Sequence, residues 1–211
     1  MKKKTFVYFT IKRLFDIFSS FFVISLVSWF LFLVFIINLF VTKGKPIYVD
    51  NRIGKKGKQI HLLKFRSMYG DAQTHPEKYF TEDQMKQWKA ERKVPNDPRL
   101  TKFGRFMRKT SIDELPQLFN IFVGQMSVVG PRPIVQSELE KNYTKEEQKI
   151  LLSARPGLIS YWGVNGRNMV SYENHARQDL ELEYFDKRGL FFDLGLIFKA
   201  VFVVISCKGA K

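Results

Sequence analysis

The longest apolar run of the chain, residues 17–41, reads IFSSFFVISLVSWFLFLVFIINLFV and carries no charged side chain. A helix needs about 20 apolar residues to cross a bilayer, so this run is long enough to be embedded in a membrane. It exceeds the ~7–15-residue core of a cleaved signal peptide, and no small-residue cleavage site follows it. The pattern therefore predicts an N-terminal membrane helix.

Positive charge flanks this run at both ends, and positive residues favour the cytoplasmic side of a membrane. A straight span satisfies only one end, whereas a re-entrant helix that enters the bilayer and returns satisfies both. Such a helix needs a break near Ser28 and Trp29, where the serine can bend a helix by bonding to an upstream carbonyl. The residues leave both arrangements open. The flanking charges are Lys2, Lys3, Lys4, Lys12 and Arg13 before the run, and Lys43, Lys45, Arg52, Lys55, Lys56 and Lys58 after it.

Two semi-alternating runs, 47–53 and 59–66, flank the turn sequence GKKGK and predict an antiparallel β-hairpin. GKKGK lacks the frame of a phosphate-binding P-loop, so we interpret it as a solvated turn. Most of the remaining chain shows helical spacing of apolar residues or a polar helical composition. Helices are expected at 81–93, 115–126, 137–152 and 171–187, and an irregular loop at 154–168.

The last apolar segment, 190–205, is interrupted by Asp193 and Lys199. It is too short and too charged to span a membrane, which favours an amphipathic helix lying on the membrane surface. These elements together predict an α+β fold that is mainly α, with one small antiparallel β-hairpin.

The charge balance indicates an anionic partner. Lys and Arg number 35 against 20 Asp and Glu, a formal net charge of +15. Nucleic acid, phosphorylated small molecules and anionic lipid all fit this excess. The single cysteine, Cys207, excludes a disulfide framework, and the three histidines lack metal-ligand spacing.

Two adjacent carboxylates, Asp113 and Glu114, stand at the head of an apolar stretch. Ser111 and Glu114 have the spacing of a helix-capping box, so a purely structural interpretation is available. The alternative is a reactive pair, because many cations surround it in sequence. The candidate cations lie in short motifs, several of which contain glycine or proline. They are Lys64, Arg66, Arg108, Arg132, Arg155 and Arg167.

As a set, these residues describe a phosphate site with a divalent metal. Arg132 lies between two prolines that restrict its backbone, and a guanidinium suits bidentate phosphate binding. We expect neighbouring arginines to lower the pKa of Asp113 and keep it ionised as a nucleophile. Glu114 is the candidate ligand of Mg²⁺, which binds carboxylates together with substrate phosphate oxygens.

The blocks KRLFDI, KFRSM, DPRLTKFGRFMRKTSIDELPQLFN, MSVVGPRP, RPG and NGRN resemble those of the bacterial sugar transferases, the monotopic phosphoglycosyl transferases. The resemblance covers nearly the whole chain and matches the minimal catalytic form. It implies a monotopic protein with an N-terminal re-entrant helix and surface amphipathic helices. Residues 1–45 would be embedded in one leaflet, and 46–211 would form a cytoplasmic catalytic domain at the bacterial inner membrane.

The resemblance also implies an activity. The enzyme would transfer sugar-1-phosphate from a UDP-sugar to polyprenyl (undecaprenyl) phosphate in surface glycan synthesis, releasing UMP. Asp113 would carry the phospho-sugar covalently, Glu114 would support Mg²⁺, Arg132 would contact phosphate, and Arg108 would position the dyad or phosphates. No nucleic-acid partner is expected, and a homo-oligomer stays open.

Four places depart from the family pattern. Trp29 replaces the proline of a Ser-Pro break, and Gln125 replaces an acidic residue. Gly163 replaces a glutamine, and Arg188-Gly189 replaces an aromatic-Ser pair. The last of these changes would affect specificity or activity. A membrane-bound Mg²⁺-dependent phosphatase or nucleotidyl transferase and a basic membrane-anchored binding protein are the alternatives.

Overall fold

The computed structural model describes residues 5–91, 94–166, 170 and 172–205, which excludes Lys2, Lys3, Lys4, Arg167 and Cys207. The chain divides into two compact units. Unit 1 is drawn from Met1–Val27, Val49–Leu63 and Gln117–Gly209, and unit 2 from Ser28–Tyr48 and Lys64–Pro116.

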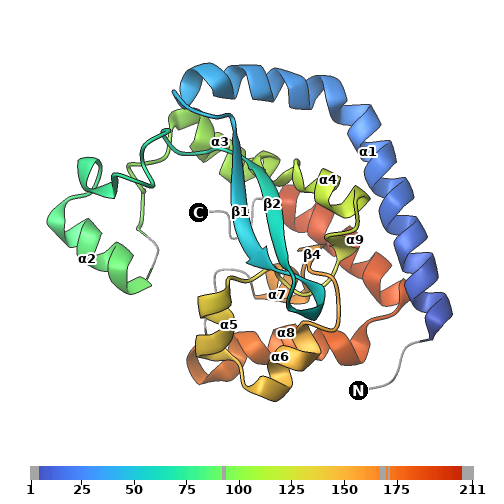
Figure 1. The fold of residues 1–211 in the computed structure, drawn as a ribbon. Helices are drawn as coiled ribbons and strands as arrows, with labels where there is room; N and C mark the ends of the chain where they lie inside the picture. The colour runs from blue at the N-terminus through green and yellow to red at the C-terminus, as the bar shows by residue number, and fades with distance from the viewer. Residues whose placement is uncertain (1–4, 92–93, 167–169, 171, 206–211) are drawn as a thin grey trace. The chain divides into compact units, whose positions relative to one another are not determined.

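The predicted N-terminal helix is present as one element, α1 (Phe6–Val41), of 36 residues (Figure 1). At 1.5 Å per residue it is about 54 Å long, more than the ~30 Å hydrocarbon core of a bilayer. Its most apolar 18-residue window has a mean hydropathy of 2.7 and is 17% buried. By length and composition α1 is able to cross a membrane, while its topology stays a prediction. The division between the units falls at Val27–Ser28, beside the position where the sequence suggested a break.

The predicted hairpin is confirmed as an antiparallel pair, β1 (Ile47–Ile53) and β2 (Gln59–Phe65), joined by a 3-10 turn at Lys55–Gly57. Unit 1 contains much of this hairpin and most of the chain's C-terminal half (Figure 1). Its further elements are α4 (Gln117–Phe122), β3 (Ser127–Val129), α5 (Gln136–Asn142), α6 (Lys145–Leu151), β4 (Gly157–Ile159), α7 (Tyr161–Asn165), a 3-10 turn at Glu173–His175, α8 (Ala176–Lys187) and α9 (Leu190–Ile205).

The core of unit 1 forms where α8 contacts α6 and α7, and α9 contacts α7, β3 and β4. Tyr184 and Phe185 of α8 are almost fully buried there, at 1% and 0% exposure. The remaining members of this core are Val129, Ile134, Leu139, Tyr143, Leu151 and Leu196. Burying several large apolar and aromatic side chains is the main source of stability for such a unit.

A short parallel pair, β3 with β4, was not expected from the sequence. Ser127 pairs with Gly157 and Val129 with Ile159. Gly130 and Gly157 face each other so closely that a Cβ on Gly157 would lie 2.1 Å from the Gly130 amide nitrogen. Only glycines permit this approach, which fixes the start of the turn that carries Arg132.

Three charged residues of α1 tie unit 1 together. Lys12 Nζ lies 2.6 Å from Asp193 of α9, and the Arg13 guanidinium donates to the carbonyls of Ile121 and Phe122 at the end of α4. Asp16 is buried and accepts hydrogen bonds from the backbone N–H of Val128 and the hydroxyl of Ser127. The KRLFDI segment therefore has a structural role, because its charged side chains connect α1 to α4, β3 and α9 within this unit.

Helix α9 matches the predicted range 190–205. It directs Asp193 and Leu196 inward, whereas Phe191, Phe198 and Phe202 are 90%, 75% and 66% exposed. The exposed residues recur at helical spacing, so one face of α9 is apolar and uncovered within the described structure.

Unit 2 contains α2 (Glu82–Glu91), α3 (Lys102–Thr110) and 3-10 turns at Pro76–Lys78 and Ile112–Glu114. The predicted exposed helix near residues 81–93 is confirmed as α2. Arg99 is buried in a bidentate pair with Asp97, and its guanidinium lies 4.4 Å from the ring centre of Phe80 and 5.1 Å from that of Trp88. Arg99 therefore stabilises this unit from inside.

Two helix predictions and one loop prediction were wrong in detail. Residues 137–152 form two helices, α5 and α6, because the chain is extended at Tyr143 and Thr144 caps the second. The helix expected at 115–126 is reduced to α4, since Gly124 adopts a positive φ of 87° and the chain then enters β3. Residues 154–168 include β4 and α7 rather than an irregular loop throughout. Helix α8 begins at Ala176, and residue 171, the start of the range expected for it, lies outside the described residues.

Candidate functional site

The dyad Asp113–Glu114 lies on the 3-10 turn that follows α3. Ser111 ends α3 in the left-handed region, with φ of 59°, and its N–H donates to the carbonyl of Arg108. Its side chain makes no capping hydrogen bond to the 3-10 turn that follows. The capping-box interpretation of Ser111 and Glu114 is therefore wrong, and capping does not account for the two carboxylates.

Helix α3 is held against the KFRSM segment by an unusually close backbone approach. The amide of Thr101 donates to the carbonyl oxygen of Ser67 at 3.1 Å. A Cβ on Gly104 would lie 1.8 Å from the same oxygen, so only glycine fits there. Arg108 Nε donates to the Ser67 hydroxyl at 2.9 Å. These contacts place KFRSM beside the helix that leads to the dyad.

The electrostatics of the dyad differ from the prediction. Burial and the neighbouring Glu114 charge raise the pKa of Asp113 to about 6, although the charges of Lys64 and Arg108 lower it. The sequence suggested a lowered pKa because it shows the cations but not the desolvation, which here outweighs them. With a pKa of about 6, Asp113 is still mostly ionised at neutral pH.

The dyad offers a metal ion two adjacent carboxylates. Both side chains are half-buried, and no described residue forms an ion pair with either of them. The described residues contain no group of three or more His, Cys, Asp or Glu side chains arranged for a metal. Mg²⁺ needs only one or two carboxylates when substrate phosphates and water complete its shell, so this donor set fits Mg²⁺ that binds with its substrate.

Arg66 has a different setting from Lys64 and Arg108. Its Nε donates to the carbonyl of Lys45 at 2.7 Å and one terminal nitrogen to that of Gly70 at 3.4 Å. Asn38 of α1 donates to the carbonyls of Pro46 and Arg66, which fixes the same segment. Arg66 thus has a clear structural task, and its role in phosphate binding stays a prediction.

Arg132 and Arg155 belong to unit 1, whereas the dyad belongs to unit 2. Arg132 is exposed, with its guanidinium 5.0 Å from the ring centre of Trp162. Arg155 Nε donates to the carbonyl of Gly124 at 2.8 Å. Arg167 lies outside the described residues. The joint site of these arginines with the dyad therefore stays a prediction.

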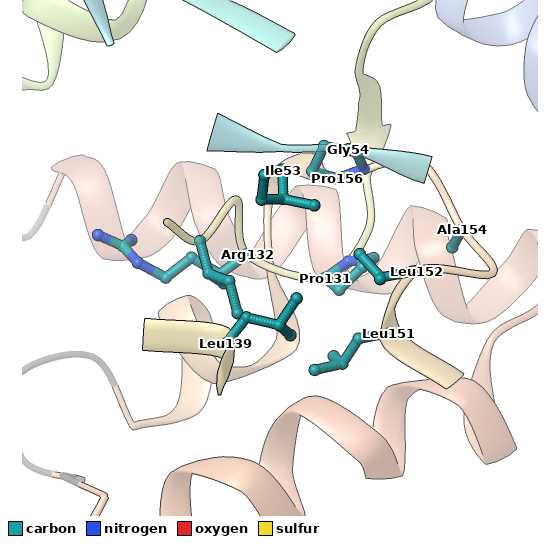
Figure 2. A pocket seen from close by; sticks show the side chains of 10 residues that line it. Ile53, Gly54, Pro131, Arg132, Leu139, Leu151, Leu152, Ala154 and Pro156 are labelled. Atoms are coloured by element: carbon teal, nitrogen blue, oxygen red, sulfur yellow. The ribbon is translucent and has the colours of Figure 1, made fainter. Parts of the chain in front are cut away.

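A pocket lies against the turn that carries Arg132, lined by the apolar side chains of Ile53, Leu139 and Leu151 among others. Figure 2 shows the Arg132 side chain extending away from Leu139 and Leu151. With a volume of about 20 Å³, the pocket is far smaller than the ~300–1,000 Å³ sites that enclose small organic ligands. We interpret it as part of the packing that holds the turn.

The sequence analysis missed a residue that holds the backbone of Arg132 in place. Glu181 of α8 is buried and accepts a hydrogen bond from the Arg132 backbone N–H at 3.1 Å. Burial raises the pKa of Glu181 to about 7, against the lowering effect of that hydrogen bond and of Arg177 and Arg132. Glu181 lies three residues after Gln178 and three before Tyr184, a helical spacing that puts it on the same face of α8 as these two buried side chains.

Gln125 and Gly163, two of the departures from the family pattern, have local structural roles. Asn120 donates both to Gln125 and to the carbonyl of His61, which links α4 to β2. The Gly163 amide donates to the hydroxyl of Ser160, the N-cap of α7. Neither contact places these residues in a reactive site.

Comparison with known proteins identifies the class. The model of the bacterial sugar transferase family matches residues 7–207, so the chain belongs to the bacterial sugar transferase family. It is 39% identical over 201 residues to the exopolysaccharide production protein ExoY of Rhizobium meliloti, covering 94% of this chain and 87% of ExoY.

Two further relatives show the same similarity. The undecaprenyl-phosphate galactose phosphotransferase of Salmonella typhimurium is 39% identical over 204 residues, which cover 95% of this chain and 41% of that protein. The uncharacterized sugar transferase EpsL of Bacillus subtilis is 34% identical over 203 residues, covering 95% of this chain and 90% of EpsL. The chain thus spans about two fifths of the Salmonella protein and most of ExoY and EpsL.

Proposed function

We propose that this protein transfers sugar-1-phosphate from a UDP-sugar to a polyprenyl phosphate such as undecaprenyl phosphate, as an early step of exopolysaccharide or capsule synthesis. Family membership supports the reaction class. The observation that carries the proposal is the half-buried Asp113–Glu114 pair, which forms no ion pair with a described residue and on which the charges of Lys64 and Arg108 act.

Relatives support the substrates by their names. The Salmonella relative is named for transfer to undecaprenyl phosphate. A relative in Escherichia coli, 32% identical over 204 residues, is a UDP-glucose:undecaprenyl-phosphate glucose-1-phosphate transferase. The two names differ in the sugar, so they support a UDP-sugar donor and a lipid-phosphate acceptor for this chain without selecting one sugar.

In the first step, a carboxylate oxygen of Asp113 attacks the phosphorus that carries the sugar. An Asp–phosphorus bond forms, the bond from phosphorus to the bridging oxygen of the diphosphate breaks, and UMP leaves with that oxygen. Lys64 and Arg108 stabilise the negative charge on the phosphoryl group during this displacement. Asp113 has to be ionised, which its pKa of about 6 allows at neutral pH.

In the second step, a phosphate oxygen of the polyprenyl phosphate attacks the same phosphorus. The Asp–phosphorus bond breaks, Asp113 returns as a carboxylate, and the product is a polyprenyl-diphosphate sugar. Glu114, with Asp113 beside it, would hold Mg²⁺, which when bound neutralises charge on the donor's diphosphate. Arg132 is the proposed further phosphate contact.

A lipid acceptor requires the protein to work at a membrane surface. The apolar length of α1 and the exposed apolar face of α9 support association with the bilayer, and the net charge of +15 supports the cytoplasmic face of the bacterial inner membrane. We propose that α1 re-enters the same leaflet, so that both of its basic flanks stay on that face.

The test is UMP release by the detergent-solubilised full chain from a panel of UDP-sugars, with Mg²⁺, in the presence and absence of undecaprenyl phosphate. The wild type should release UMP with one donor in a lipid-dependent manner. Asp113→Asn preserves shape but removes the nucleophile, so its rate should fall at least about 10³-fold.

The matched control is Asp83→Asn, which changes an exposed aspartate on α2 in the same unit and should leave the rate unaltered. A rate for Asp113→Asn equal to that of the control would remove Asp113 as the nucleophile. UMP release that does not depend on the lipid would point to hydrolysis of the donor instead.

A further inference from the structure

Two cations of unit 1 lie near one aromatic ring at the start of α1. Lys55 Nζ lies 6.0 Å from the ring centre of Phe9, and the Arg188 guanidinium carbon lies 5.6 Å from the same centre. Arg188 also lies 5.0 Å from the ring centre of Phe185. We call Lys55, Arg188 and Phe9 the basic cluster. None of its members belongs to the set assigned to the transfer reaction.

The positive charge of the basic cluster is not compensated within the described residues. Arg188 is only 6% exposed, yet its Nε has no hydrogen-bond partner there. Lys55 is half-buried, and its ammonium group makes no hydrogen bond or ion pair with a described residue. Burial lowers the pKa of Lys55, and the charges that add to this effect are all positive: Arg155, Lys56 and Arg188.

The adjacent carboxylate is already committed to other partners. Asp193 Oδ2 accepts from the Tyr8 hydroxyl at 2.9 Å and from Lys12 at 2.6 Å. Its Oδ1 accepts from the Tyr184 hydroxyl at 3.3 Å. Because buried cations are costly without a counter-ion, the basic cluster requires an anion that the described residues do not supply.

The surroundings of the basic cluster indicate what carries that anion. The Tyr8–Asp193 hydrogen bond joins the first turns of α1 and α9, and both turns expose large apolar side chains. Phe6 of α1 is 85% exposed and Phe191 of α9 is 90% exposed. A ligand held by the cations would therefore have apolar surface beside it, which suits a molecule with a phosphate head and hydrocarbon tails.

We infer that Lys55 and Arg188 bind the phosphate of a diacyl phospholipid, whose acyl chains lie along the apolar first turns of α1 and α9. The guanidinium and the ammonium group each donate charge-assisted hydrogen bonds to phosphate oxygens. The neighbouring carboxylate of Asp193 is held by three donors and is not available to react with the lipid. We therefore expect the basic cluster to bind the lipid without changing it. This site would anchor unit 1 at the depth of the lipid headgroups.

The test is native mass spectrometry of the detergent-solubilised full chain titrated with dioleoyl phosphatidic acid. The wild type should retain one lipid molecule, and Lys55→Gln and Arg188→Gln should each bind it about tenfold more weakly or worse. Lys58→Gln is the matched control, because it removes the same charge from an exposed position in the same turn and should bind like the wild type. Since Arg188 is buried, each variant must show the wild-type circular dichroism spectrum, and Lys55→Gln tests the site without a change in the core.

Two further ligands separate the sources of binding. Dioleoyl glycerol has the tails without phosphate, and glycerol 3-phosphate has the phosphate without tails; neither should bind at concentrations that saturate the protein with phosphatidic acid. Equal binding of glycerol 3-phosphate would overturn the lipid assignment in favour of a free phosphate. Equal affinity of wild type, Lys55→Gln and Arg188→Gln for phosphatidic acid would remove the site altogether.

Discussion

Gly104 has no side chain, and this lets two backbone segments near the dyad come into contact. Glycine inside a helix usually costs about 1 kcal/mol relative to alanine. Here the position touches the Ser67 carbonyl oxygen, which a Cβ would approach to 1.8 Å. Gly104 therefore allows KFRSM to lie against α3, with Arg108 bonded to the Ser67 hydroxyl.

Gly104→Ala should consequently destabilise the protein, by about 1–3 kcal/mol, because the added methyl group forces two backbones apart. Gly195→Ala is the matched control, since a Cβ at this helical glycine of α9 meets nothing within 4 Å and should be neutral or stabilising by up to ~1 kcal/mol. Thermal unfolding in detergent measures both. Equal melting temperatures for the two variants would contradict the close approach at Ser67.

Glu181 is a second residue whose environment predicts a measurable effect. Its pKa is raised from 4.5 to about 7 in the folded protein, so the folded state binds more protons than the unfolded state between these values. Stability should therefore fall as the pH rises from about 4.5 to about 7, by about 3 kcal/mol in total, and stay lowered above that range.

Glu181→Gln keeps an acceptor for the Arg132 N–H but does not titrate. Its melting temperature should depend less on pH between 4.5 and 7 than that of the wild type. Glu146→Gln, an exposed position on α6, should retain the wild-type pH dependence. If the Glu181→Gln and wild-type profiles run parallel, the buried carboxylate is not the source of the effect.

At the scale of elements, the same local motif has opposite outcomes at two places in the chain. Ser111–Glu114 and Thr144–Glu147 both have capping-box spacing. Of these two, Thr144 forms the box: its side chain accepts from the backbone N–H of Glu147, and the Glu147 side chain accepts from that of Thr144. Ser111 instead ends α3 in a left-handed conformation. Whether the box forms depends on the conformation of the chain before the motif, here the end of α3. That conformation depends on tertiary contacts, which the spacing of four residues does not show.

Thr144→Ala should weaken the start of α6 by about 1 kcal/mol, because the backbone N–H of Glu147 loses its acceptor, the Thr144 hydroxyl. Thr144→Ser keeps the hydroxyl and should restore most of the lost stability. Melting temperatures of the three proteins check this. A Thr144→Ser variant as unstable as Thr144→Ala would show that the methyl group, and not the cap, is responsible.

At the scale of the whole molecule, the sequence predicted what depends on local pattern. The apolar run located α1, the turn residues located the hairpin, and the interrupted apolar segment located α9. The β3–β4 pair was not predictable in this way, because Ser127 and Gly157 are far apart in sequence and each strand has only three residues. Neither was the network of Lys12, Arg13 and Asp16, because the sequence shows Lys12 and Arg13 only as basic charges beside an apolar run.

In the candidate site, too, local features were predictable from the sequence and long-range contacts were not. The sequence was enough to propose the dyad and Arg108, because they lie within one short block, and Lys64, because it lies in a recognisable motif; their roles stay predictions. The direction of the Asp113 pKa shift was wrong, because it depends on burial that only the fold creates. Glu181 was missed, because its function is to support a turn that lies 49 residues earlier in the chain.

The hydrogen bond between the first turns of α1 and α9 has a consequence for the synthesis of the chain. The Tyr8–Asp193 hydrogen bond joins residues separated by 185 positions, so α1 cannot complete its packing until α9 has also been synthesised. Long-range contacts of this kind form late. Until α9 has been synthesised, the apolar and basic surfaces of α1 must be covered by the bilayer or by a chaperone.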